Sequence, residues 1–143
     1  ALISAERNSY TYKENLARGH ELEAVIAHAR YGYKTERGSF IENFGTPQAI
    51  EVSEKSLFVV NLKDDPGFFD RIAQFSKQFE QDSVLMIPKG GEESYLLGTK
   101  EGNDFPPYKE QISHMFLKIK ILKKSCKPIK NYLEIKDGLS RKW

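Results

Sequence analysis

Four polar residues with the chemistry of an anion-binding site gather near the start of the chain: Arg7, Asn8, Asn15 and Arg18. Guanidinium groups bind phosphate and carboxylate through paired hydrogen bonds, and each asparagine side chain supplies both donors and an acceptor. Asn15 and Arg18 are three residues apart, so on a helix they share a face. Free backbone amides at the start of that helix would add to the attraction for an anion. The pattern predicts a site for an anionic ligand.

Two interpretations of this cluster stay open on the sequence alone. In an enzyme, the arginines would clamp a phosphate-containing substrate, the asparagines would orient it, and Glu6 or Glu14 would be the general base. In a structural interpretation, the same arginines and asparagines pair with Glu6, Glu14 and Glu21 or hold the loop before the helix in place.

Standard catalytic and metal-binding motifs are missing from the sequence. It contains no phosphate-binding glycine loop with its lysine, no zinc-binding histidine pair on a helix and no nucleophile elbow. His20 and His28 are eight residues apart on one predicted helix, about 12 Å at 1.5 Å per residue, which is too far to share a metal ion. Cys126 is the single cysteine, so no internal disulfide can form. We predict no cofactor and no metal, and we leave open whether the chain is an enzyme.

Charge is distributed unevenly along the chain. Residues 1–108 contain 12 lysines and arginines against 17 aspartates and glutamates, whereas residues 109–143 contain 10 against 3. A basic segment of this kind is typical of binding to nucleic acid or to an acidic protein surface. A lysine-rich edge strand that prevents edge-to-edge pairing has the same composition. The candidate binding residues of the segment are Lys118, Lys120, Lys123, Lys124, Lys127 and Lys130.

The elements that must position these residues follow from local patterns. Thr11 and Glu14 form a capping-box pattern before a helix expected over 12–30. A second helix has its apolar face at residues 68, 72, 75 and 79, with Asp65 as its expected N-cap. Strands are expected over 1–5, 56–62, 83–88 and 94–99, and alternating lysines predict a basic strand near 115–121. Residues 33–35 and 39–43 are expected to form a strand or a hairpin around Arg37 and Gly38.

This order of elements predicts an α+β fold of the ferredoxin-like type, with a split βαβ sheet and two helices on one of its faces. We expect a core domain over 1–107 and a basic C-terminal strand extension over 108–143 that packs on the same domain. Gln81, Asp82 and Ser83 form a second polar group that lies either near the cluster around Arg7 or at the opposite end of the sheet. If the first strand and the strand over 83–88 are neighbours, as this order permits, the two groups could meet.

Several short segments resemble a group of small uncharacterised proteins of bacteria and their phages. They are Ile3-Ser4-Ala5-Glu6-Arg7-Asn8, Glu14-Asn15 with Arg18, Glu21 and Leu22, then Gly32 and Gly38, Glu54 with Ser56-Leu57-Phe58-Val59-Val60, and Gln81-Asp82-Ser83-Val84. The likeness spans about residues 1–87. The resemblance implies a phage-encoded or mobile-element protein in the bacterial host cytoplasm or in a virion. It brings no activity with it.

Our main hypothesis from the sequence is a small non-enzymatic, phage-type binding protein that engages nucleic acid or a host protein through the basic C-terminal segment. No membrane partner is expected, and the oligomeric state stays open. The first alternative is the enzyme described above. The second is a structural virion or assembly component that uses the apolar residues Phe105, Tyr108 and Trp143 as an interface.

Overall fold

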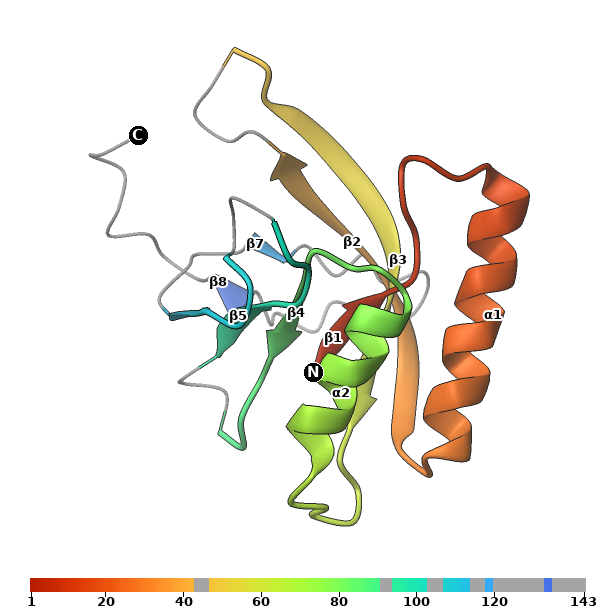
Figure 1. The fold of residues 1–143 in the computed structure, drawn as a ribbon, viewed down its shortest axis with the longest axis vertical. Helices are drawn as coiled ribbons and strands as arrows, with labels where there is room; N and C mark the ends of the chain where they lie inside the picture. Colours follow the sequence, from red (N-terminus) through yellow and green to blue (C-terminus); the bar gives the residue numbers. More distant parts are fainter. Residues whose placement is uncertain (43–46, 91–93, 103–106, 114–117, 120–132, 135–143) are drawn as a thin grey trace, which may run out of the picture.

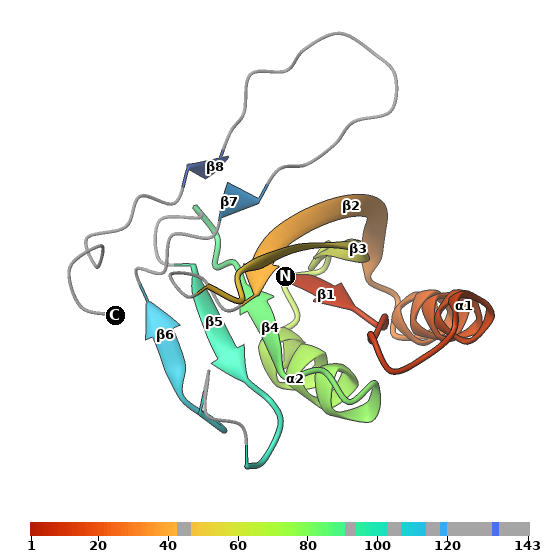
Figure 2. The ribbon, with the colours of Figure 1, turned by 90° about the horizontal axis from the view of Figure 1, so that it is seen from above.

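A computed structural model describes residues 1–42, 47–90, 94–102, 107–113, 118–119 and 133–134. Along the chain it contains β1 (Leu2–Ser4), α1 (Tyr12–His28), β2 (Gly32–Glu42), β3 (Ile50–Val60), α2 (Phe68–Gln78), β4 (Ser83–Met86), β5 (Tyr95–Gly98), β6 (Gln111–Ser113), β7 (Lys118–Ile119) and β8 (Leu133–Glu134). Strands β1 to β6 form one sheet in the order β2-β3-β1-β4-β5-β6, with every neighbouring pair antiparallel. Figure 2 shows both helices on one face of this sheet. The predicted α+β, ferredoxin-like fold is confirmed.

Helix α1 begins where the capping box was predicted. The Thr11 side chain accepts a hydrogen bond from the Glu14 backbone amide at 3.3 Å, and Glu14 Oε2 accepts one from the Thr11 amide at 2.7 Å. Leu22 and Ile26 are buried and lie one helical turn apart, so they define the face of α1 that packs against the sheet. The helix ends at His28, two residues before the end that was predicted.

Helix α2 has the predicted apolar face but a different start. Phe68, Ile72 and Phe79 are buried, while Phe75 packs against the core from a half-buried position. The prediction that Asp65 caps this helix was wrong, because the N-cap is Gly67 and no side chain bonds there. Asp65 instead stabilises the turn before the helix, where its Oδ1 accepts a hydrogen bond from the Gly67 amide at 2.9 Å.

Strands β2 and β3 form a long two-stranded hairpin that extends beyond the rest of the sheet (Figure 1). Of the two alternatives left open around Arg37 and Gly38, a strand or a hairpin, the structure has the strand. These residues lie within β2, opposite Lys55 and Glu54 of β3. Gly38 is therefore a glycine in a strand interior, which weakens a strand without ending it.

The core lies between the sheet and the two helices. The sheet contributes Ile3, Leu57, Val59, Val84 and Met86, and the helices contribute Leu22, Ile26, Phe68 and Ile72, with Phe79 just beyond the end of α2. Each of these side chains is at most 5 % exposed. The alternation of buried and exposed residues in β3 shows how the period of two in the sequence produces a one-sided core.

The C-terminal part of the chain is described only in short pieces. Strand β6 continues the main sheet past residue 107, and β7 pairs with β8 in a second, two-stranded sheet. The division into domains at residue 107 therefore stays a prediction. The residues Phe105, Lys120, Lys123, Lys124, Cys126, Lys127, Lys130 and Trp143 lie outside the described residues. Lys118 is in β7.

The described residues contain neither a membrane-spanning helix nor a metal-binding cluster. No helix among them combines the length and apolar character needed to cross a membrane. Within the same residues, no group of three or more histidine, cysteine, aspartate or glutamate side chains is placed to hold a metal ion.

Candidate functional site

The two polar segments of the sequence meet at one end of the sheet. Strands β1 and β4 are antiparallel neighbours, so the loop that follows β1 lies beside the residues that precede β4. Arg7 Nη1 is 3.5 Å from Asp82 Oδ1, and Gln81 Nε2 donates to the Glu6 carbonyl at 3.3 Å. The expectation that Gln81 and Asp82 would approach the cluster around Arg7 is confirmed.

The backbone of Arg7 is held from α1 by Asn15. Asn15 Oδ1 accepts a hydrogen bond from the Arg7 amide at 2.9 Å, and Asn15 Nδ2 donates to the Arg7 carbonyl, also at 2.9 Å. Both peptide groups of Arg7 are thus paired with a single side-chain amide. The Asn15 side chain is half-buried on the first turns of a capped helix, which makes it a firm support for the loop.

Arg18 ties the same loop to the end of α2. Its Nε donates to the Ala5 carbonyl at 2.9 Å and its Nη2 donates to the Phe79 carbonyl. Its guanidinium carbon lies 4.6 Å from the centre of the Tyr10 ring and 5.8 Å from that of Phe79. These contacts are typical of a cation held between two rings, and they fix the loop against α2.

The corner between α2 and β4 has a backbone conformation that usually belongs to glycine. Gln81 N donates to Ser76 O and Glu80 N to Lys77 O, both at 2.9 Å, which is the Schellman pattern of a helix end. Glu80 occupies the left-handed position of this pattern with a φ of 57°. Arg7 Nη1 donates to the Glu80 carbonyl, and the Tyr10 hydroxyl donates to Glu80 Oε2 at 3.3 Å.

A buried hydroxyl network supports the floor of the site. Thr99 Oγ1 donates to the Gln81 carbonyl at 2.7 Å and lies 2.8 Å from Ser76 Oγ. Thr99 has one hydroxyl proton, so Ser76 must be the donor in the second contact. The Thr99 amide also donates to the Asp82 carbonyl at 2.9 Å. This network attaches β5 to the α2–β4 corner.

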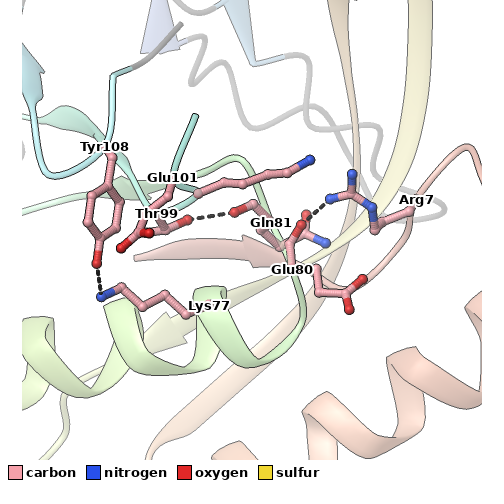
Figure 3. A pocket seen from close by; sticks show the side chains of 8 residues that line it. Arg7, Lys77, Glu80, Gln81, Thr99, Glu101 and Tyr108 are labelled. Atoms are coloured by element: carbon pink, nitrogen blue, oxygen red, sulfur yellow. Dashed lines mark hydrogen bonds between the residues drawn. The ribbon is translucent and has the colours of Figure 1, made fainter. Parts of the chain in front are cut away.

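A cavity of about 350 Å³ opens beside these groups. It is lined by Arg7, Lys77, Glu80, Gln81, Thr99, Lys100, Glu101 and Tyr108. Figure 3 shows Arg7 and Glu80 on one side of it and Tyr108 with Glu101 on the other. Its volume lies within the range of roughly 300–1,000 Å³ that is typical of small-molecule sites.

The lining combines both signs of charge with one aromatic ring. Asp82 is shared by two cations, since Lys100 Nζ is 3.4 Å from the same Oδ1 that Arg7 approaches. On the opposite side, Lys77 Nζ donates to the Tyr108 hydroxyl at 2.7 Å, and Lys109 Nζ lies 5.0 Å from the centre of that ring. Such a lining suits a small ligand that carries an anionic group, a cationic group and a flat ring.

The predicted site residues have different surroundings in the structure. Arg7 lines the cavity, while Asn15 and Arg18 stand behind it and hold its loop. Asn8 is exposed on the turn before α1. Whether these residues contact a ligand stays a prediction. The two candidate bases make other bonds, because Glu6 Oε2 accepts from the Lys55 amide at 3.1 Å and Glu14 belongs to the cap.

The cap also sets the acidity of Glu14. Hydrogen bonds from the Thr11 side chain and then from the Thr11 backbone hold the pKa of the Glu14 carboxyl below its usual range. A carboxylate stabilised in its charged form is a weaker base, and Glu14 does not line the cavity.

Five lining residues were not predicted as site residues: Lys77, Glu80, Thr99, Lys100 and Glu101. They come from the end of α2 and the end of β5, two places that carry no motif. The signal that could have found them is the register of the sheet. Ser83 pairs with Gly98, so the residues just before β4 and just after β5 must lie side by side.

A second groove runs between the two helices. Its volume is about 610 Å³ and its lining includes Glu21, His28, Arg30, Arg71 and Phe75. It shares no residue with the cavity beside Arg7.

Comparison with known proteins gives one match. A model of the S-adenosylmethionine lyase family matches residues 1–125, which is most of the chain. No curated protein and no solved structure matches the chain.

This match overturns the main functional hypothesis from the sequence. A lyase family points to an enzyme, so the prediction of a non-enzymatic protein that binds nucleic acid or a host protein through its basic tail was wrong. The description as an uncharacterised phage-type protein is replaced as well, because the family is named for an activity. The enzyme alternative is the better supported one, although S-adenosylmethionine contains a carboxylate and no phosphate. An acidic protein partner stays a prediction that these findings do not test.

Proposed function

Because the chain belongs to the S-adenosylmethionine lyase family, we propose that it cleaves S-adenosylmethionine in the cavity beside Arg7. The family match over residues 1–125 is the observation that supports the reaction. The lining of the cavity supports the location, since cations, carboxylates and an aromatic ring surround one space there beside Arg7.

The reaction itself needs no covalent bond between substrate and protein. The sulfur of S-adenosylmethionine is a sulfonium, bonded to three carbons and positively charged. When one C–S bond breaks, its electron pair stays on sulfur, which leaves as a neutral thioether. In a lyase reaction the carbon that loses sulfur receives no water. It is instead attacked by a nucleophile of the same substrate molecule, or a neighbouring carbon gives up a proton and a double bond forms.

Each part of the substrate has a suitable partner in the lining. The Arg7 guanidinium would hold the carboxylate by paired hydrogen bonds. The Tyr108 ring would stack on the adenine, and the carboxylates of Glu80 and Glu101 would attract the sulfonium and ammonium charges. For this to happen Arg7 must give up its weak contact with Asp82, whose Oδ1 is 3.5 Å away and is also approached by Lys100.

The contribution of the protein to the rate would then be orientation and exclusion of water. Fixing the carboxylate and the adenine at opposite ends of the cavity limits the conformations of the chain between them, which is the usual source of rate enhancement in an intramolecular reaction. Since the positive charge on sulfur disappears in the reaction, carboxylates that attract the sulfonium stabilise the bound substrate more than the transition state, so they would add to affinity and not to the rate. If a proton is removed, Glu80 and Glu101 are the two carboxylates in the lining that could act as the base.

The experiment that tests this proposal is an assay of S-adenosylmethionine consumption by the purified full chain, followed by liquid chromatography. The wild-type protein is expected to consume the substrate and to release one thioether per molecule consumed. Arg7→Gln should raise KM about tenfold or more, because a charge-assisted hydrogen bond contributes about 1.5–3 kcal/mol. The matched control is Arg37→Gln, which removes an exposed arginine in the middle of β2.

Two results would contradict the proposal in different ways. A wild-type protein that leaves S-adenosylmethionine intact would contradict the function. Cleavage with the same KM in wild type and Arg7→Gln would keep the function but place the carboxylate elsewhere than at Arg7.

A further inference from the structure

We propose that Asn15 is a positioning residue that acts through Arg7, and that it thereby sets the ability of the site to recognise the substrate carboxylate. This inference rests on the proposed function, because it takes Arg7 as the residue that binds the carboxylate. It gives Asn15 a role distinct from the ligand contact that the sequence suggested.

The contacts between the two residues are unusually complete. A single side-chain amide pairs with both the N–H and the C=O of Arg7 at 2.9 Å, and its Nδ2 also reaches the Tyr10 carbonyl at 3.3 Å. The Arg7 carbonyl accepts a further bond from the Tyr10 amide at 3.1 Å. Asn15 thus closes the loop between β1 and α1 into a fixed shape from one side chain.

Neither strand nor helix hydrogen bonds hold this loop. Residues 5–7 have no regular secondary structure, residues 8–10 form a turn and bend, and α1 starts at Tyr12. Arg18 secures the beginning of the loop at Ala5, and Asn15 secures it at Arg7 itself. Without Asn15, the Arg7 peptide groups keep only the bond that the carbonyl accepts from the Tyr10 amide, so the position of Arg7 is less constrained. A displacement of about 1 Å is enough to lose the geometry that paired hydrogen bonds require.

The direction in which the Arg7 side chain leaves the loop matters because its guanidinium already contacts the wall of the cavity. Its guanidinium donates to the Glu80 carbonyl and lies 3.5 Å from Asp82 Oδ1, and its side chain is 23 % exposed. A guanidinium held on the wall of the cavity by one carbonyl still has free N–H groups for a carboxylate. If the backbone moved, the same side chain would turn to solvent or to Asp82 alone.

A positioning role makes a specific prediction. Loss of Asn15 should weaken recognition of the carboxylate but not of the rest of the ligand. The probes are S-adenosylhomocysteine and its decarboxylated form, two thioethers with an uncharged sulfur that differ by one carboxylate and that cannot lose sulfur as a sulfonium does. Calorimetric titration of the full chain with each probe gives two Kd values, and their ratio measures the recognition of the carboxylate alone.

The variants are chosen to separate positioning from loss of stability. Asn15→Ala removes both hydrogen bonds to Arg7, and Asn15→Asp keeps the acceptor for the Arg7 amide but loses the donor. Thr11→Ala removes the side-chain cap of the same helix but no contact with Arg7. It is therefore the control for any loss of stability that Asn15→Ala causes. Arg7→Gln, alone and combined with Asn15→Ala, tests whether Asn15 acts through Arg7.

The expected result is a wild-type preference for the carboxylate-bearing probe that falls roughly tenfold in Asn15→Ala, in line with the loss of a charge-assisted contact. Asn15→Asp should give an intermediate ratio, Thr11→Ala the wild-type ratio, and Asn15→Ala no further change in the Arg7→Gln background. The affinity for the decarboxylated probe should stay within about twofold throughout, because that probe has no group for Arg7 to bind.

The outcomes separate the inference from the function on which it rests. An Asn15→Ala protein that keeps the wild-type ratio while Arg7→Gln loses it would overturn the positioning role and leave the function standing. A ratio that Arg7→Gln does not change would overturn both the placement of the carboxylate and this inference. An equal fall in Thr11→Ala and Asn15→Ala would show a general effect of stability and would also overturn it.

Discussion

Replacing Thr99 by valine should be one of the most costly single-atom changes in the described part of the protein. Thr99 is 4 % exposed and Ser76 is fully buried. The Thr99 hydroxyl donates to the Gln81 carbonyl at 2.7 Å and accepts from Ser76 Oγ at 2.8 Å. Valine has the same shape, so packing is kept while Ser76 loses an acceptor and Gln81 loses a donor.

The expected loss of unfolding free energy follows from the two polar groups that lose Thr99 as a partner, the Ser76 hydroxyl and the Gln81 carbonyl. A buried polar group that loses its partner costs about 1–3 kcal/mol, so Thr99→Val should lower the free energy of unfolding by about 2–4 kcal/mol. Ser76→Ala removes the hydroxyl that donates, and Thr99 can still donate to the Gln81 carbonyl. It should cost only about 0.5–1 kcal/mol, partly offset by the higher helix propensity of alanine.

The comparison of the two variants is measured by urea unfolding followed by far-ultraviolet circular dichroism, with the slope m checked for equality among the proteins. The double variant should be more stable than the sum of the single losses predicts, because Ser76→Ala removes the hydroxyl that Thr99→Val leaves unpaired. A Ser76→Ala protein that loses as much stability as Thr99→Val would refute the direction of the hydrogen bonds and the reasoning built on it.

Three further predictions concern stability. Thr11→Ala removes the Thr11 side chain from the capping box that it forms with Glu14. The free energy of unfolding, measured by urea denaturation, should fall by about 1 kcal/mol. A free energy equal to that of wild type within experimental error would argue against the capping box. Glu80→Gly relieves a φ of 57° and should raise that free energy by about 1 kcal/mol relative to Glu80→Ala, which keeps the strain; equal stabilities would contradict the left-handed conformation. Burial and the bond to Asp65 raise the pKa of Tyr31 from 10.0 to about 12, so its contribution to stability is present below pH 10 and is lost as the pH rises to about 12. Wild type should therefore lose stability more steeply than Tyr31→Phe between these pH values, and parallel curves would argue against the shift.

The fold followed from the sequence because its signals are local. The capping box at Thr11 and the apolar spacing of α2 each depend on residues within a few turns, and both were found where they were expected. The ferredoxin-like order then fixes β1 and β4 as neighbours, which is why the approach of Asp82 to Arg7 could be foreseen. The start of α2 was misplaced because Asp65 fits more than one local structure, and for the same reason a strand and a hairpin both stayed open around Gly38 until the structure showed the strand.

Only some of the residues that line the cavity could be predicted from the sequence. Arg7 was singled out from its residue type and its place before a helix. Thr99 and Glu101 carry no such signal, because their place in the site is set by the pairing of β4 with β5. The function was misjudged for a related reason. A cluster of charge in the tail is conspicuous in a sequence, whereas the residues that line the cavity come from four separate segments and form no local motif.

The most direct test of the central claim is the mass balance of the reaction. Purified protein is mixed with S-adenosylmethionine, and the products that form first are identified by rapid-quench mass spectrometry. We predict a neutral thioether and a second fragment whose masses add up to that of the substrate, with formation slowed in Arg7→Gln. Products whose masses add up to substrate plus one water would contradict the account, because they would show hydrolysis in place of lyase chemistry.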